Sequence, residues 1–315
     1  MNKRDLILSL LDPDQTPEYV PAAFFLHFDP AYHRGRAAID KHLEFFRYTG
    51  MDFVKIQYEH HVSQPQINRP EDWARLPRYG EDFFAEPLKV VEGLVNAAKD
   101  EALVLVTLYS PFMWASQIAG DQQLTRHVHE NLALVQQGME AITGSVRTFV
   151  RACIRLGVDG FYASTQGGES HRFADVSLFN ACVRPYDLSI MEEIDQACIF
   201  NVLHVCDYHG GYDDLTRFLD YPGHVVNTPL QVGDRRLSPQ EVATLFNRPY
   251  MGGMERTGVI ASGTPEAVRA AAGSILDQAP EHFILAADCT VPSNTPWDNL
   301  RTAIETAHHH RHPRS

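Results

Sequence analysis

Residues 200–206 read FNVLHVC, and residues 283–289 read FILAADC. Each is an apolar run of strand length whose last residues turn polar, a pattern typical of a buried strand in a parallel sheet. Ligands bind at the carboxyl ends of such strands. Because residues i and i+2 point to the same side of a strand, His204 and Cys206 can present an imidazole and a thiol to one point, and Cys289 can supply a second thiolate. One His and two Cys suit zinc, with a fourth position left for an acid, water or substrate.

Eight strand-like runs can be counted along the chain, and helical patterns follow them. Eight β-then-α units predict a (β/α)8 TIM barrel. A doubly wound open sheet is the alternative, but no Gly-x-Gly-x-x-Gly fingerprint follows any run. The strand-like runs are residues 22–28, 53–57, 103–108, 158–163, 200–206, 224–227, 249–252 and 283–289. The helical patterns are residues 36–48, 88–99, 122–156, 186–196, 213–219, 239–246, 264–277 and 295–307.

The chain has 315 residues, of which 44% are hydrophobic, and its formal net charge is −13. That length supports a large core, and no linker, repeat or low-complexity segment divides it, so residues 1–315 are expected to form a single TIM-barrel domain. Lys and Arg are scattered, which does not favour nucleic acid as a partner. No apolar run approaches the roughly 18 residues of a membrane helix. No secretory h-region follows the N-terminus, and the His-rich end at residues 307–313 is expected to be solvated.

Five cysteines in 315 residues are too few to indicate a disulfide framework. A reducing, cytoplasmic location is therefore expected. Cys153, Cys182 and Cys198 lie at apolar, helix-like positions and are expected to be core residues.

In a TIM barrel the strand ends and the loops after them build the site. We expect Glu59, Asp207 and Glu255 to act as acid–base groups or as a fourth metal ligand. The alternatives are a solvent-exposed loop acid for Asp207 and a surface loop for residues 59–61, because adjacent residues on a strand point opposite ways. The polar residues projected onto the mouth are His27, Asp29, Tyr58, Glu59, Tyr109, Ser110, Ser164, Gln166, His204, Cys206, Asp207, Asn227, Thr228, Glu255, Asp288 and Cys289.

Three of these strand-end residues, Tyr109, Gln166 and Asn227, are predicted to bind the cofactor. For His204 and Cys206 the alternative is an ordinary core His and core Cys, since free Cys is among the most buried residue types. The presence of Cys289 at a second strand end favours the metal interpretation.

Four segments resemble a known family. Residues 285–300 read LAADCTVPSNTPWDNL, a small-residue strand followed by a Val-Pro loop, Thr-Pro and Asn. Residues 252–256 (GGMER), 263–268 (GTPEAV) and 225–227 (VVN) also fit. Together they resemble the uroporphyrinogen decarboxylase superfamily, whose fold is a TIM barrel. The resemblance is good over residues 150–305 and looser before them.

The resemblance implies one of two branches. True uroporphyrinogen decarboxylases need no metal and carry an N-terminal Arg-x-Ala-Gly-Arg-Tyr motif, which the corresponding residues 25–32 (FLHFDPAY) lack. The other branch contains corrinoid:thiol methyltransferases, including methylcobamide:coenzyme M methyltransferases, which bind zinc through His-x-Cys and a distant Cys. His204, Cys206 and Cys289 match those positions. The similar cobalamin-independent methionine synthase adds an acid from a neighbouring strand, but Asn227 ends that strand here, so the fourth ligand is open.

The resemblance therefore implies a zinc-dependent methyltransferase that moves a methyl group between a corrinoid, carried by a partner protein, and a small thiol or similar acceptor. A metal stabilises a coordinated thiolate at neutral pH. Three alternatives stay open: a metal-free decarboxylase or lyase of the same fold, a demethylase working in the opposite direction, and a non-catalytic ligand-binding barrel. The sequence determines neither the substrate nor the oligomeric state.

Overall fold

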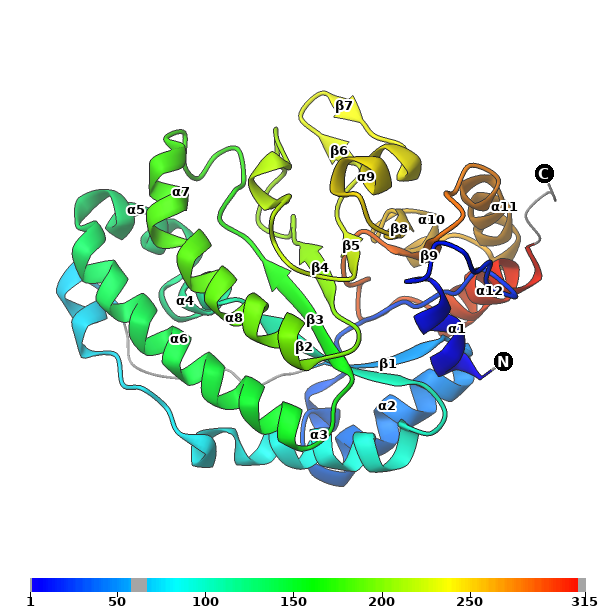
Figure 1. The fold of residues 1–315 in the computed structure, drawn as a ribbon, viewed down its shortest axis with the longest axis horizontal. Helices are drawn as coiled ribbons and strands as arrows, with labels where there is room; N and C mark the ends of the chain where they lie inside the picture. Colours follow the sequence, from blue (N-terminus) through cyan, green and yellow to red (C-terminus); the bar gives the residue numbers. More distant parts are fainter. Residues whose placement is uncertain (1, 58–66, 311–315) are drawn as a thin grey trace.

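The computed structural model describes residues 2–57 and 67–310. Its centre is a curled parallel sheet of seven strands in the order β1-β2-β3-β4-β5-β8-β9 (Figure 1). These strands are buried along nearly their whole length, as expected when helices cover a parallel sheet. The strands are β1 (Phe53–Ile56), β2 (Leu103–Tyr109), β3 (Gly160–Thr165), β4 (Val202–Val205), β5 (Val225–Asn227), β8 (Tyr250–Met254) and β9 (Phe283–Ala287).

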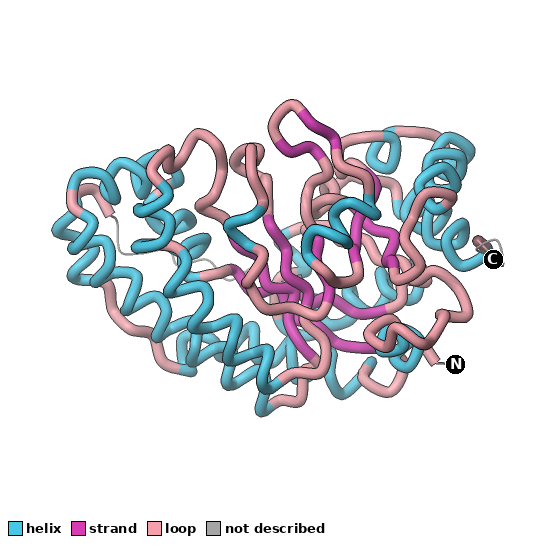
Figure 2. The backbone as a smooth tube through the Cα atoms, turned by 45° about the horizontal axis from the view of Figure 1, so that its top comes forward, coloured by secondary structure: helices cyan, strands magenta, loops and turns pink. Residues whose placement is uncertain are grey.

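Helices surround the sheet, and Figure 2 shows them outside the central strands. Helices α4 to α8 lie on one side, whereas α1 and α12, near the two ends of the chain, lie together on the other (Figure 1). Of the helices described, none has the length and apolar character that a bilayer crossing requires. The helices are α1 (Lys3–Ser9), α2 (Gly35–Thr49), α3 (Ala85–Ala98), α4 (Pro111–Ala119), α5 (Asp121–Glu130), α6 (Leu132–Arg155), α7 (Val176–Cys182), α8 (Arg184–Ala197), α9 (Pro239–Phe246), α10 (Val259–Ser262), α11 (Pro265–Leu276) and α12 (Trp297–His309).

The predicted α/β fold with a parallel sheet is confirmed, whereas a full eight-strand barrel is not, because the described residues form a curled half-barrel of seven strands. Residues 22–28, expected to be the first strand, make only isolated bridges, from Ala22 to Leu285 and from Leu26 to Val291. The segment passes between β9 and β1, yet neither neighbour stays alongside it. Strand β9 ends at Ala287. On the other side, within residues 2–57 and 67–310, one backbone hydrogen bond joins the segment to the start of β1, from Asp52 N to Ala22 O at 3.0 Å. An extended segment with so few ladder bonds does not form a regular strand.

The buried carboxylate of Asp52 holds this seam together. It accepts hydrogen bonds from the backbone N of Ala22 at 2.8 Å and from the hydroxyl of Tyr19 at 2.9 Å. Lys3 Nζ donates at 3.1 Å, and His308 Nε2 lies at 2.8 Å. Burial acts to raise the pKa of Asp52, but contacts with His308 and Lys3 lower it overall. One ion thus joins α1, the irregular segment, the start of β1 and α12.

Several element boundaries differ from the sequence prediction. Helix α9 occupies the predicted residues, and its Ser238 N-cap accepts from the backbone N of Glu241. The predicted helix at residues 213–219 is reduced to a 3-10 turn, Thr216–Phe218. A hairpin of β6 (Gln231–Val232) and β7 (Arg235–Arg236) was not predicted, although Gly-Asp between its strands is a hairpin signal.

The cysteines predicted to lie in the core do so. Cys153, Cys182 and Cys198 are free and buried, in or next to α6, α7 and α8. Burial raises the pKa of each of these thiols, as expected for cysteines that serve packing.

A fully buried carboxyl, Asp187 of α8, lies beneath the ends of β2 and β3. It accepts a hydrogen bond from Thr165 Oγ1 at 2.6 Å and a longer one from the backbone N of Phe112 at 3.5 Å. Burial raises the pKa of Asp187 to about 7, with the Thr165 hydroxyl opposing the shift. The folded protein therefore favours the protonated acid.

We expect Asp187→Asn to stabilise the protein increasingly as pH rises. An unfolded Asp ionises near about pH 4, whereas the folded one stays protonated to about 7, so ionisation of the unfolded chain destabilises the wild type across this window. The stability of the variant relative to wild type should rise by about 2–3 kcal/mol between pH 5 and pH 8. Urea unfolding at both pH values measures it. Asp195→Asn, on the exposed face of the same helix, is the control, and an equal response of both variants contradicts the assignment.

Candidate metal centre and its surroundings

Strands β4 and β9 bring the three predicted metal ligands together. His204 is in β4, Cys206 follows that strand directly, and Cys289 lies just beyond β9. Both strands are parallel members of one sheet, so their carboxyl ends lie at the same edge. Strands β5 and β8 separate them, and the curl of the sheet closes the remaining distance. The three side chains are buried, with exposed fractions of 2%, 4% and 8%.

The spacing of the three donor atoms fits one metal ion. Cys206 Sγ lies 3.9 Å from Cys289 Sγ, and Cys289 Sγ lies 3.5 Å from His204 Nε2. All the ligand atoms fall within 4.8 Å of one another. Two sulfurs bound tetrahedrally to one zinc at about 2.3 Å are about 3.8 Å apart, and a sulfur–nitrogen pair is about 3.6 Å apart. The donor set and its spacing therefore suit zinc.

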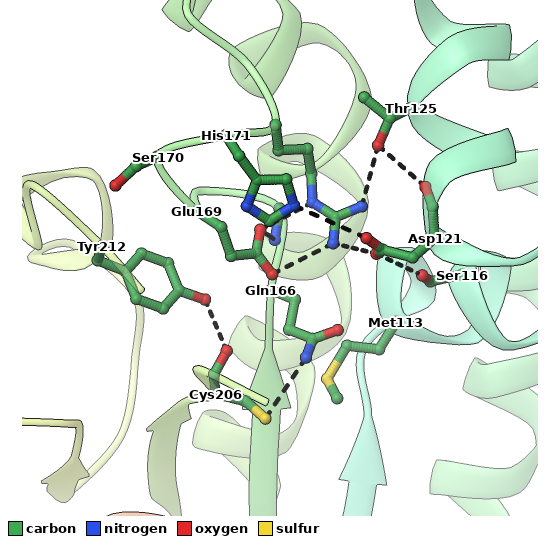
Figure 3. Close-up of polar contacts among 12 residues, drawn as sticks. Met113, Ser116, Asp121, Thr125, Gln166, Glu169, Ser170, His171, Cys206 and Tyr212 are labelled. Atoms are coloured by element: carbon green, nitrogen blue, oxygen red, sulfur yellow. Dashed lines mark hydrogen bonds and ion pairs between the residues drawn. The ribbon is translucent and has the colours of Figure 1, made fainter. Parts of the chain in front are cut away.

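Neighbouring side chains fix the orientation of these ligands. The ring of Tyr162 packs against that of His204, with centroids 4.9 Å apart. Gln166 Nε2 points to Cys206 Sγ at 3.5 Å, and Met113 lies beside this pair (Figure 3). His204 Nδ1 is buried and has no hydrogen-bond partner among residues 2–57 and 67–310. The sequence analysis missed Met113 and Tyr162, since nothing in their local sequence marks them.

A buried cation, Lys55 of β1, was also missed. Its Nζ donates to Gln57 Oε1 at 2.8 Å and lies 4.5 Å and 4.7 Å from the ring centroids of Phe25 and Tyr162. Tyr162 therefore packs against Lys55 as well as His204, inside the sheet.

The two cysteines differ in their tendency to ionise. The hydrogen bond with Cys206, together with His204 and Arg256, lowers the pKa of Cys289 well below that of an ordinary thiol, although burial opposes ionisation. The same hydrogen bond and burial raise the pKa of Cys206. Cys289 is thus the more readily ionised thiol of the pair.

Asp207 and Asp288 stand next to the two cysteine ligands, and Arg256 lies between them. Arg256 Nη1 is 2.5 Å from Asp207 Oδ1 and 3.7 Å from Asp288 Oδ1. Burial raises the pKa of both carboxyls, and the Arg256 charge opposes the shift. Asp207, predicted to be a fourth ligand or an acid–base group, is placed in an ion pair, and that predicted role stays untested.

Of the other two predicted acids, only Glu255 belongs to the described residues, and it lines the same cleft as Asp207 and Arg256. Glu255 is exposed, and its Oε1 pairs with Arg236 Nη1 at 2.6 Å. Glu59 lies outside the described residues. No further His, Cys, Asp or Glu side chain of the described residues joins the cluster of His204, Cys206 and Cys289.

The residues predicted to bind a cofactor have distinct surroundings. Tyr109 packs against the buried cluster of Met113, Cys206 and Cys289, and its hydroxyl accepts from Gln57 Nε2 at 3.1 Å. Gln166 is directed at Cys206, as described above. Asn227 is completely buried, and its amide is engaged by the protein. Binding roles for these three stay predictions.

Two of the remaining projected residues cap helices. Ser110 Oγ accepts from the backbone N of Met113 at 3.4 Å, and Asp29 Oδ1 accepts from the backbone N of Ala31 at 3.0 Å. Tyr58 lies outside the described residues.

An open cleft of about 210 Å³ is lined by Asp207 and Asp288, which are the chain neighbours of the ligands Cys206 and Cys289. Asp207, Arg256 and Asp288 contribute to it, and the β6–β7 hairpin provides Gln231 and Arg236. The hairpin stands out from the body next to β5 and β8 (Figure 1). The charged residues of the cleft thus lie beside the cysteine pair.

Comparisons with known proteins agree with this geometry. The family model for uroporphyrinogen decarboxylase (URO-D) matches residues 49–310. A methylcobamide:CoM methyltransferase, MtbA, from Methanosarcina mazei is 24% identical over 253 residues, which cover 80% of this chain and 72% of that protein.

Solved structures share the fold. A methyltransferase from Methanosarcina mazei superposes with a TM-score of 0.77 at 13% identity, covering 98% of both chains. A B12-independent methionine synthase from Shewanella sp. W3-18-1, in complex with selenomethionine, gives a TM-score of 0.56 at 11% identity, covering 92% of this chain and 96% of that one.

We expect Asn227→Ala to destabilise the protein. Asn227 Oδ1 accepts from the hydroxyl of Tyr162 at 2.7 Å, and Nδ2 donates to Met251 O at 2.8 Å and Ala287 O at 3.0 Å. Losing these bonds leaves buried polar atoms without partners and should lower the free energy of unfolding by about 2–4 kcal/mol. Urea unfolding measures it, with the exposed Asn180→Ala as control. If the two variants are equally stable, the hydrogen bonds of the Asn227 amide do not contribute to the free energy of unfolding, which contradicts this prediction.

Proposed function

The chain belongs to the uroporphyrinogen decarboxylase (URO-D) family, and on that premise we propose that it is a zinc-dependent methyltransferase, moving a methyl group between a corrinoid and a thiol or similar acceptor. The observation that carries the proposal is the buried group of His204, Cys206 and Cys289, whose ligand atoms all lie within 4.8 Å of one another. The similarity to a methylcobamide:CoM methyltransferase supports the choice of reaction.

In this proposal His204, Cys206 and Cys289 hold the ion. When bound there, zinc would act as a Lewis acid and lower the pKa of a coordinated substrate thiol, so that the thiol is ionised at neutral pH. The two cysteine sulfurs place negative charge beside that position, which favours a nucleophilic sulfur. Gln166 and Tyr162 hold Cys206 and His204 in place, through a hydrogen bond and ring packing.

The size of the cleft favours a small acceptor. A volume of about 210 Å³ is below that of pockets that enclose drug-sized ligands. A small thiol fits, whereas a corrinoid is far larger and has to approach the open mouth. We therefore propose that a partner protein presents the corrinoid there. Asp207 and Arg256 line this mouth, where a methyl group would pass between the cobalt of the corrinoid and the substrate sulfur, one bond to carbon forming as the other breaks.

We expect about one zinc per chain in protein purified without chelator and with its His-rich tail removed. Cys206→Ser and Cys289→Ser should each lose the metal and keep their circular dichroism spectrum, because a core of this size does not depend on one catalytic ion. Elemental analysis measures the metal.

The matched control is a chain with Cys153, Cys182 and Cys198 all changed to Ala. It should keep its zinc, because these thiols are buried in the core, although its stability should fall by some kcal/mol. Folded wild type without zinc, and with no uptake on zinc addition, contradicts the metal site. Unfolding of the two single serine variants would indicate a structural ion.

We expect a thiol substrate to add a third sulfur to the zinc shell, at about 2.3 Å. Binding should release a proton near neutral pH, because the thiol ionises when it coordinates. X-ray absorption with and without a panel of small thiols tests the shell. Loss of the cobalt–carbon chromophore of methylcobalamin tests methyl transfer.

Two results would point to different functions. An unchanged shell with every thiol, together with intact methylcobalamin, favours the metal-free lyase alternative. A shell that gains sulfur while methylcobalamin stays intact indicates thiol binding with another methyl donor.

A further inference from the structure

The guanidinium of Arg256 lies between the carboxylates of Asp207 and Asp288 at the edge of the proposed metal site. Arg256 Nη1 contacts Asp207 at 2.5 Å and approaches Asp288 to 3.7 Å. Asp207 directly follows the ligand Cys206, and Asp288 directly precedes the ligand Cys289. The side chains of all three charged residues are about four-fifths buried, so solvent screens their interactions only partly.

The two carboxylates are held differently. Asp288 Oδ1 also accepts from the backbone N of Arg256 at 2.9 Å, a bond that does not depend on the guanidinium. The Asp207 carboxylate, by contrast, accepts its hydrogen bond from the guanidinium itself, at Arg256 Nη1. Removing the Arg256 side chain therefore releases Asp207 and leaves Asp288 tethered by the backbone.

We propose that Arg256 is a positioning residue that holds Asp207 away from the metal, so that the fourth coordination position stays open for substrate. This inference rests on the proposed zinc site. A metal with three protein ligands keeps a position for substrate, whereas four protein ligands close the shell, as in structural zinc sites. Asp207 has the residue type of such a fourth ligand and directly follows the ligand Cys206.

The physical reason is the cost of an unpaired buried charge. A largely buried carboxylate that loses its cation either takes up a proton or finds another cation. For Asp207, next to Cys206, the cation at hand is the metal. Arg256 prevents this by ion pairing, and it does so without adding a donor atom, because a guanidinium does not ligate metals.

The test uses the zinc-loaded full chain and three variants: Arg256→Gln, Arg256→Gln with Asp207→Asn, and Arg256→Gln with Asp288→Asn. Zinc affinity is measured by competition with a chromophoric chelator. Access to the open position is measured on the cobalt(II)-substituted protein, from the charge-transfer band that 2-mercaptoethanol induces. The two double variants carry the same net charge, so they separate ligation by Asp207 from a general electrostatic effect.

We expect Arg256→Gln to bind zinc about tenfold more tightly than wild type and to need about tenfold more 2-mercaptoethanol for the same band. Adding Asp207→Asn should reverse both changes, whereas adding Asp288→Asn should leave both in place. Equal reversal by the two carboxyl substitutions overturns the proposal in favour of through-space charge. Weaker zinc binding by Arg256→Gln overturns it in favour of a merely structural clamp.

These outcomes differ from a failure of the proposed function. A wild-type chain that binds no zinc removes both, and the elemental analysis above detects it independently. A wild-type chain that binds zinc, with an Arg256→Gln variant that matches it in both measurements, overturns the role of Arg256 alone.

Discussion

The buried amide of Asn227 is the interaction on which the rest of the structure depends. It accepts from Tyr162 of β3 and donates to backbone carbonyls of Met251 in β8 and Ala287 in β9, while belonging to β5. Parallel ladders join only neighbouring strands, so a side chain that spans four strands sets how tightly the sheet curls. Strands β5 and β8 lie between β4 and β9. The curl allows the ends of β4 and β9 to meet around one point despite that separation.

The same amide network continues into the site. Tyr162 donates its hydroxyl to Asn227 and packs its ring against His204, so the sheet interior fixes the imidazole directly. On the cleft side of the ligands, charged residues replace the packed apolar side chains. Arg256 lies among Asp207, Asp288 and Cys289, and its charge favours the ionised form of all three. The interior thus positions the ligands, and the mouth sets the charge that a substrate meets.

The sequence predicted elements best where a local signal decided them. Helix α9 carries its own capping box and begins where predicted, after Ser238. Residues 22–28 have the composition of a strand but form only bridges, because their pairing depends on where β9 and β1 begin and end. Composition reports that a segment will be buried and extended. It does not report whether a neighbouring strand lies alongside for long enough to form a ladder.

The sequence by itself determined a parallel α/β fold and singled out His204, Cys206 and Cys289 as candidate metal ligands. It could do so because the two-residue period of a strand and the polarity of strand ends are local properties. Only the tertiary structure decided that Cys206 and Cys289 lie 3.9 Å apart, that Asp207 pairs with Arg256, and that Tyr162 and Met113 line the centre. Those contacts join segments far apart in the chain. Their distances follow from the curl of the sheet, which no single stretch of sequence encodes.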